Sequence, residues 1–248
     1  MMRLPKQSKS LACAAVLLGL VLLAAIGPTV GHAAFGAGSA VTAWLDGARR
    51  SVLEGTVAGA LSAVIGCGLA GLAVVGPGFL DGALARAAQW TGALPSVVVV
   101  FALCAVTASH GALAFAAAIA VVRGVGAAWV LRTSLSTLAR EEYVLAARAL
   151  GSGSFRLFRT HLFPPLAGLA ASQAAFTLTT VVALEAATAF LGLDTVSTSF
   201  GTLLSGAAER HSATAALSPL FGVAAIVLPV QAVGLHVAAR ARVGRRFS

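Results

Sequence analysis

The 248-residue sequence predicts an all-α polytopic membrane protein with six transmembrane helices. Apolar residues make up 58% of the chain and charged residues only 10%, whereas roughly 25% of residues are charged in a typical soluble domain. The mean hydropathy is +0.93. Six apolar stretches also approach or exceed the roughly 20 residues that a helix needs to cross a bilayer. Together these observations place the chain in the membrane class.

The six predicted spans follow one another along the whole chain. The first begins at Leu11 after three basic residues, and a cleaved secretory signal peptide is the alternative interpretation of that segment. Its apolar region is long for a signal peptide, which favours a retained span. The stretch from Ala93 to Val122 is too long for one helix, and His110-Gly111 predicts a tight turn that divides it. The predicted spans are about 11–30, 52–75, 94–109, 112–131, 165–189 and 213–239.

Basic residues predict the orientation, because loops rich in Lys and Arg stay in the cytoplasm. With the N-terminus inside, thirteen of the 17 Lys and Arg residues fall on the cytoplasmic side. Only Arg49, Arg50 and Arg210 fall on the outer side, and Arg123 falls within a span. Both termini are therefore predicted to be cytoplasmic. The longest cytoplasmic loop, about 132–164, joins spans four and five.

The sequence lacks the residues that several other classes of protein require. Neither Lys6 nor Lys9 lies in a phosphate-binding glycine loop, so no ATP site is predicted in this chain. Cys13, Cys67 and Cys104 lie in apolar runs without a CxxC pair, and they predict neither a metal site nor a disulfide. The five histidines have no catalytic spacing, which argues against a membrane enzyme. A secondary transporter is disfavoured because no inverted halves with broken helices are seen. The basic balance fits a membrane surface better than a nucleic-acid partner.

The loop between spans four and five carries the most specific motif. Ala146, Ala147, Gly151 and Pro164 match the pattern Glu-Ala-Ala, three residues, Gly, nine residues, Ile, one residue, Leu-Pro. His161 takes the place of the Ile, while Leu145 and Phe163 replace the Glu and the Leu. The loop thus resembles the EAA signature of binding-protein-dependent ABC importer permeases, and most closely their dipeptide/oligopeptide/nickel group.

Three other regions resemble the same family in the same order. They are residues 47–51 before span two, residues 78–81 with 93–96, and residues 185–193 with 199–203. The chain departs from the family at Gln89, where an Asp is usual, and at Asp194, where a Gly is usual. The outer segment 31–46 is short and lacks the family's Gly-Thr-Asp and Gly-Arg-Asp motifs. These departures bear on the docking of a binding protein and on the solute.

The resemblance implies a type I ABC importer permease fold with a cytoplasmic coupling-helix loop. It also implies that the chain is a transport subunit, not an enzyme, and that it lies in the bacterial inner membrane in contact with lipid. The implied partners are a second permease subunit, two ATP-binding subunits that carry ATP-Mg, and an extracytoplasmic solute-binding protein. No cofactor is expected on this chain itself. The coupling residues that the resemblance implies are Glu142, Ala146, Ala147, Arg148, Gly151, His161 and Pro164. The expected domain boundaries are 1–46 for the tail, first span and outer segment, 47–240 for the permease domain with its loop 140–165, and 241–248 for a basic tail.

The residues of the coupling loop predict its local structure. Helix-forming residues from Glu142 to Leu150 predict a short helix, and Gly151 is expected to end it in a left-handed backbone conformation. A second short helix is expected to follow outside the membrane. Pro164 and Pro165 are expected to break the chain before span five. The alternative is an amphipathic surface helix whose arginines bind anionic lipid headgroups.

Two ionisable residues lie within the predicted spans. Arg123 is nine residues before Arg132, about 13 Å deeper at 1.5 Å per residue, where a cation costs roughly 2.5 to 3.5 kcal/mol. It lines the pathway, snorkels, or pairs with a carboxylate of the partner subunit. Glu185 matches a family glutamate, and it is either an outer-gate or subunit-interface residue or a simple interfacial one. Gly55 and Gly59 predict close helix packing. Peptide, nickel and other small solutes all remain open.

Overall fold

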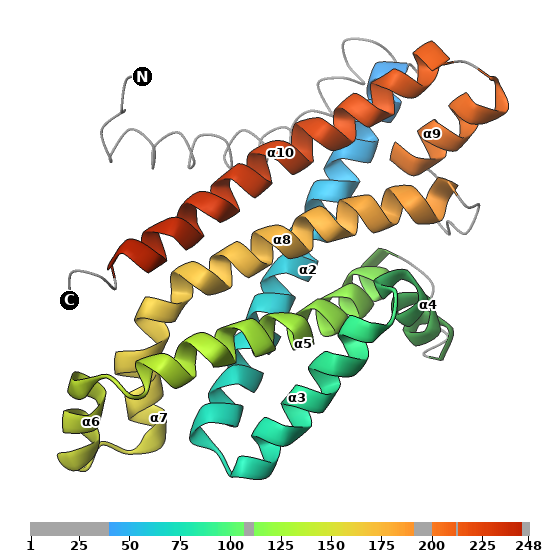
Figure 1. Ribbon diagram of the computed structural model, residues 1–248. Helices are drawn as coiled ribbons and strands as arrows, with labels where there is room; N and C mark the ends of the chain where they lie inside the picture. Colours follow the sequence, from blue (N-terminus) through green and yellow to red (C-terminus); the bar gives the residue numbers. More distant parts are fainter. Residues whose placement is uncertain (1–39, 107–111, 191–199, 212, 245–248) are drawn as a thin grey trace, which may run out of the picture. The chain divides into compact units, whose positions relative to one another are not determined.

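A computed structural model describes residues 40–106, 112–190, 200–211 and 213–244 (Figure 1). Throughout these ranges the regular elements are helices. They are α2 (Ala40–Val75), α3 (Gly78–Ala93), α4 (Ser96–Val106), α5 (Ala112–Leu138), α6 (Glu142–Ala149), α7 (Ser154–Leu157), the π-helix η1 (Phe158–Leu162), α8 (Phe163–Phe190), α9 (Phe200–Glu209) and α10 (Ala213–Gly244). The all-α fold class is confirmed.

Four helical stretches are long and apolar enough to cross a membrane: Val41–Val75, Leu113–Leu138, Phe155–Glu185 and Leu217–Leu235. A fifth crossing is formed if α3 and the first part of α4, which meet at 107°, count as one broken span. The first predicted span, 11–30, and the predicted turn at His110-Gly111 lie outside the described residues. In the described chain, α4 alone has 11 residues, fewer than span three was expected to have.

Two helix boundaries differ from the prediction for local reasons. Helix α2 begins at Ala40, twelve residues before the predicted start, and so includes Arg49 and Arg50. These charges do not end the helix, because Arg50 pairs with Glu54 one turn later. The expected loop after span two is instead helix α3. Its first turn holds Asp81, whose negative charge suits a helix N-terminus, and it ends at Leu94, which is extended before Pro95.

The chain divides into two compact units, and the division falls within α2, α8 and α10. Unit 1 comprises residues up to Thr56 and Leu178–Val233. Its core contains Ala48, Val52, Val182, Phe200 and Ile226. Trp44 packs edge-on against Phe200, with ring centroids 5.7 Å apart, and donates from Nε1 to the Ser218 carbonyl at 3.3 Å. Helix α9 is held in this way against the N-terminal parts of α2 and α10.

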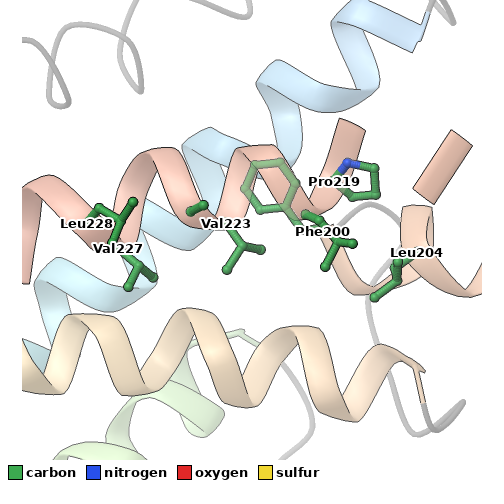
Figure 2. A pocket seen from close by; sticks show the side chains of 8 residues that line it. Phe200, Leu204, Pro219, Val223, Val227 and Leu228 are labelled. Atoms are coloured by element: carbon green, nitrogen blue, oxygen red, sulfur yellow. The ribbon is translucent and has the colours of Figure 1, made fainter. Parts of the chain in front are cut away.

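Unit 1 also contains a cavity of about 300 Å³ between α9 and α10 (Figure 2). The side chains that line it are all apolar: Phe200, Leu204, Pro219, Leu220, Val223, Ala224, Val227 and Leu228. With no charged or hydrogen-bonding side chain in its wall, this cavity does not suit a peptide or a metal ion.

Unit 2 comprises Val57–Thr177 and the chain from Gly234. Helices α3, α4 and α5 pack against one another, and the α6–α7 segment lies at the C-terminal end of α5 (Figure 1). Small residues allow the helices to approach closely, as the sequence predicted for Gly59. A Cβ atom at Gly59 would lie 2.7 Å from the Ala174 carbonyl oxygen of α8. Nearby, Ser62 Oγ donates to Thr177 Oγ1 at 2.9 Å.

Alanine substitutions at two glycines of α2 are expected to change stability in opposite directions. Gly68→Ala should stabilise the protein by roughly 0.5–1 kcal/mol, because a Cβ there meets no atom within 4 Å and alanine favours a helix. Gly59→Ala should destabilise it by roughly 1–3 kcal/mol, since the added atom would collide with the α8 backbone. Thermal unfolding of the two purified variants in one detergent measures the difference. Equal shifts would contradict the α2–α8 contact in unit 2.

Candidate functional site

The segment from Glu142 to Leu162 forms a helix, a tight turn and a second helical piece, as predicted. Helix α6 ends in a Schellman motif: the amide of Ser152 donates to the Ala147 carbonyl at 3.1 Å, and the amide of Gly151 donates to the Arg148 carbonyl at 3.0 Å. Gly151 has φ 83°, so the expected left-handed conformation is confirmed. A Cβ at Gly151 would meet no atom within 4 Å. Glycine is therefore required there by the backbone angle and not by crowding.

The inner face of this segment is anchored in the core of unit 2. Val144 in α6 and Leu162 in η1 are both completely buried. They belong to one apolar cluster with residues of α2, α5, α7 and α8. Its buried members are Ala70, Leu131, Leu135, Leu138, Val144, Leu157, Leu162, Leu166, Leu169 and Ala170. Movement of α6 would therefore be transmitted directly to the ends of three membrane-length helices.

The outer face of the segment exposes large apolar side chains. Leu150 is 88% exposed, Phe155 75% and Leu145 49%. Arg148, Arg156 and Arg159 are exposed on the same segment. Exposed apolar side chains rimmed by charge are typical of a protein contact surface. We call the apolar residues Leu145, Leu150 and Phe155, together with the basic residues Arg148, Arg156 and Arg159, the loop surface.

The predicted coupling residues divide between the two faces. Ala147 is partly buried against the apolar cluster. His161 is also partly buried, and its ring lies 6.3 Å from the ring of Tyr143, which links η1 to α6. Desolvation, together with the charge of Glu141, raises the pKa of the Tyr143 phenol above its usual range. The exposed members are Glu142, Ala146, Arg148, Gly151 and Pro164.

The connection to α8 corrects one prediction. Pro164 and Pro165 do not break the chain, because α7, η1 and α8 follow one another without an intervening loop. The amide of Phe163 donates to the Phe158 carbonyl, which is the wider turn of a π-helix. Both prolines then occupy the first turn of α8, where a missing amide donor is tolerated. The second helical piece of the loop is thus continuous with a membrane-length helix.

An ion pair that the sequence did not predict lies before the loop, at the end of α5. Arg132 donates from Nε to Asp81 Oδ1 of α3 at 2.5 Å and from Nη2 to Asp81 Oδ2. The Arg132 guanidinium carbon also lies 5.4 Å from the centre of the Trp129 ring. This bidentate contact joins α3 to α5 within unit 2.

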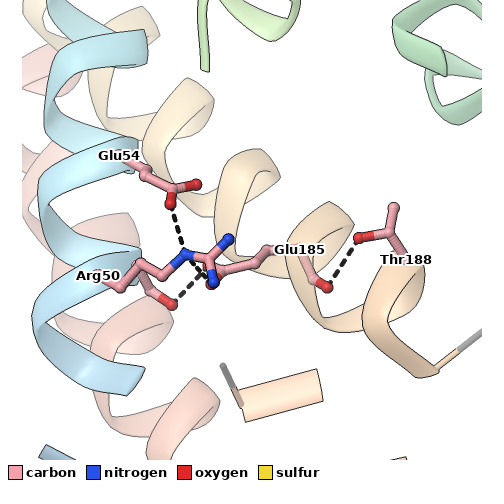
Figure 3. A network of polar contacts seen from close by, with 5 residues as sticks. Arg50, Glu54, Glu185 and Thr188 are labelled. Carbon is pink, nitrogen blue, oxygen red and sulfur yellow. Dashed lines mark hydrogen bonds and ion pairs between the residues drawn. The ribbon is translucent and has the colours of Figure 1, made fainter. Parts of the chain in front are cut away.

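Glu185 lies in a buried polar cluster of unit 1 that joins α2 to α8 (Figure 3). Ser51 Oγ donates to Glu185 Oε2 at 2.6 Å, and Arg50 Nε lies 3.6 Å from Glu185 Oε1. Arg50 Nε also donates to Glu54 Oε1 at 2.6 Å. We call Arg50, Ser51, Glu54 and Glu185 the polar cluster. One arginine is therefore shared between two buried carboxylates.

Arg123 lies elsewhere, within α5 in unit 2. Its side chain is partly buried, and its Nε is buried without a hydrogen-bond acceptor. No ion pair joins it to any residue that the structure describes. The site residues predicted from sequence thus belong to the loop and the middle of α5 in unit 2 and to the polar cluster in unit 1.

Sequence reasoning missed Leu150, Phe155 and the partners of Glu185. Two of these features could have been predicted from local spacing. Arg50 and Glu54 have the four-residue spacing of a helical ion pair. Val144 and Ala147 mark the inner face of a helix, which leaves Leu145 on its outer face. The contacts of Glu185 and Asp81 join residues far apart in the chain, and no local pattern indicates them.

Comparisons with known proteins agree with the all-helical membrane architecture. The model of the family described as "binding-protein-dependent transport system inner membrane component" matches residues 55–243.

The chain is 31% identical over 147 residues to the dipeptide transport system permease protein DppC of Bacillus subtilis (strain 168), covering 59% of this chain and 46% of the relative. It is 29% identical over 153 residues to the oligopeptide transport system permease protein OppC of the same strain, covering 62% and 50%. A putative peptide permease protein of Brucella ovis is 28% identical over 194 residues, covering 76% and 63%. The chain thus spans about half the length of the first two relatives.

Proposed function

Because the chain belongs to the family of binding-protein-dependent transport system inner membrane components, we propose that it forms half of the translocation pathway of an ATP-driven peptide importer. Its membrane-length helices supply the structural basis for a pathway. The relatives are named as a dipeptide and an oligopeptide permease, which favours peptides over nickel as the solute.

The loop surface is the observation that carries the coupling proposal. It exposes Leu145, Leu150 and Phe155 on a segment whose other face is locked into the core by Val144. We propose that this surface docks on an ATP-hydrolysing subunit. An anchored element of this kind moves as a unit, so a push from the partner reaches α5 and α8 and not only the loop.

The remaining partners follow from the same proposal. A second permease subunit completes the pathway, two ATP-binding subunits carry ATP-Mg, and an extracytoplasmic solute-binding protein delivers the solute. Lys6 and Lys9 lie outside any phosphate-binding motif, so hydrolysis is assigned to the partner subunits. The distribution of basic residues supports an inner-membrane protein with both termini and the loop in the cytoplasm.

Arg123 and Glu185 are proposed to act in the pathway and at its gate, respectively. Arg123 lies in a membrane-length helix, where an ionisable residue marks a functional site more often than a structural one. Glu185 belongs to the polar cluster that fastens α2 to α8, so its contacts decide whether these two helix segments can separate.

Reconstitution tests the proposed function. The purified chain alone is expected to hydrolyse ATP only at background rate, whereas proteoliposomes with the ATP-binding subunits, the second permease and a loaded binding protein should take up a dipeptide when ATP is supplied. Labelled dipeptide and released phosphate are measured together, with a complex lacking this chain as the control. Strong hydrolysis by the chain alone, or equal uptake without it, would reject the proposal.

A further inference from the structure

Arg123 lies close to the middle of its membrane span. The span Leu113–Leu138 places it ten residues after the first end, about 15 Å along the helix. Measured from Arg132, it is nine residues away, about 13 Å. Both distances are near half of the roughly 30 Å bilayer core. Snorkelling to the membrane surface serves arginines near the ends of a helix, and Arg123 is near neither end.

The described chain supplies no counter-charge for this arginine. The described residues of unit 2 include three carboxylates. Asp81 is paired with Arg132, and Glu141 and Glu142 lie beyond the end of α5. Arg123 makes no hydrogen bond or ion pair to a described residue, and its Nε is buried without an acceptor. A guanidinium in an apolar span without an anion is costly, so an anion from outside the residues that the structure describes is expected to complete it.

A strip of α5 leads from Arg123 toward the loop. Gly126, Val130, Thr133 and Thr137 follow it at intervals of three and four residues, which places all five on one side of the helix. Val130 is 40% exposed, and the other three are also exposed. A Cβ at Gly126 would meet no atom within 4 Å, so there is open space one turn from the arginine. The hydroxyls of the two threonines donate to carbonyls of their own helix, Thr133 to Trp129 and Thr137 to Thr133.

We propose that Arg123 binds the carboxylate of the transported peptide at the middle of the membrane. This inference rests on the proposed function and adds the chemical group that the pathway recognises. A guanidinium presents two parallel N–H donors that match the two oxygens of a carboxylate, and in a site of low dielectric such a pair is strong. The charge that is unfavourable in the empty pathway is then neutralised only when solute is present.

The test compares two solutes in the reconstituted complex: a dipeptide with a free C-terminal carboxylate and the same dipeptide as its C-terminal amide. Arg123→Gln is expected to lower uptake of the free acid by about tenfold or more, the effect of one charge-assisted hydrogen bond, and to change amide uptake by less than about twofold. The same binding protein delivers both dipeptides to both complexes. Its own preference therefore cancels when the ratio of free-acid uptake to amide uptake is compared between the unchanged and the Arg123→Gln complex. Arg86→Gln, which removes an exposed arginine of α3, is the matched control and should leave the ratio unchanged.

Each other outcome overturns the proposal. An equal loss for both solutes, with less second permease subunit recovered in the complex, would assign Arg123 to a carboxylate of that subunit. No loss for either solute would remove it from the pathway. Failure of Arg123→Gln to insert in the membrane would show that the charge has a structural partner. Absence of uptake by the unchanged complex would instead reject the proposed function, so the two failures are distinguishable.

Discussion

Replacing Gly151 with valine is expected to reduce solute uptake by about tenfold or more while leaving the protein in the membrane at normal abundance. Gly151 adopts φ 83°, where a side chain costs roughly 1–2 kcal/mol and a β-branched one more. The turn is exposed and no atom lies within 4 Å of the added Cβ, so the strain is confined to the end of α6. Relief of the strain must shift Leu150 and the end of α6, and these belong to the proposed docking surface.

Gly153 provides the matched control for this substitution. It is exposed, a Cβ there also meets open space, and its φ lies outside the left-handed region. Gly153→Val should therefore retain uptake. Gly151→Asn should keep more activity than Gly151→Val, because asparagine tolerates the left-handed region. Uptake and co-purification of the ATP-binding subunits are measured for all three variants at matched expression.

The lipid-binding alternative makes the opposite prediction for the loop. If Arg148, Arg156 and Arg159 serve to bind anionic headgroups, their joint replacement by glutamine should reduce uptake in a way that depends on anionic lipid, and Gly151→Val should change little. Normal uptake and normal co-purification in Gly151→Val would reject the docking role of this turn.

Local features of the chain could be predicted because they depend on neighbours in sequence. Length and hydropathy indicated the long helices, and the spacing around Gly151 indicated a helix that ends in a left-handed turn. Helix α3 was missed because its sequence has no long uninterrupted run of apolar residues. It ends where Leu94 takes an extended conformation before Pro95. Pro164 misled because a proline was expected to break the chain, whereas it lies in the first turn of α8, where a missing amide donor is tolerated.

The polar contacts could not be predicted, because they join distant parts of the chain. Asp81 and Arg132 are 51 residues apart, and Ser51 and Glu185 are 134 apart. Each side chain alone is compatible with an exposed membrane interface. Only the packing of α2 on α8 in unit 1 shows that Glu185 is 3% exposed and accepts a hydrogen bond from its own chain.

Removal of Arg50 should destabilise the protein far more than removal of Glu185, although both belong to the polar cluster. Arg50 is the cation that contacts both Glu54 and Glu185, whose side chains are 5% and 4% exposed. Arg50→Gln takes that cation away from two buried carboxylates, a change that typically costs about 3–5 kcal/mol. Glu185→Gln leaves the Arg50–Glu54 pair in place and keeps an amide oxygen for Ser51, so its cost should be about 1 kcal/mol.

The two variants are compared by membrane abundance and by thermal unfolding in detergent. Arg49→Gln is the control, since Arg49 precedes Arg50 on the same helix but is exposed, and its removal should change stability by less than about 0.5 kcal/mol. If Glu185→Gln proved the more damaging change, or if Arg50→Gln behaved like Arg49→Gln, the shared arginine would not be what holds α2 and α8 together in unit 1.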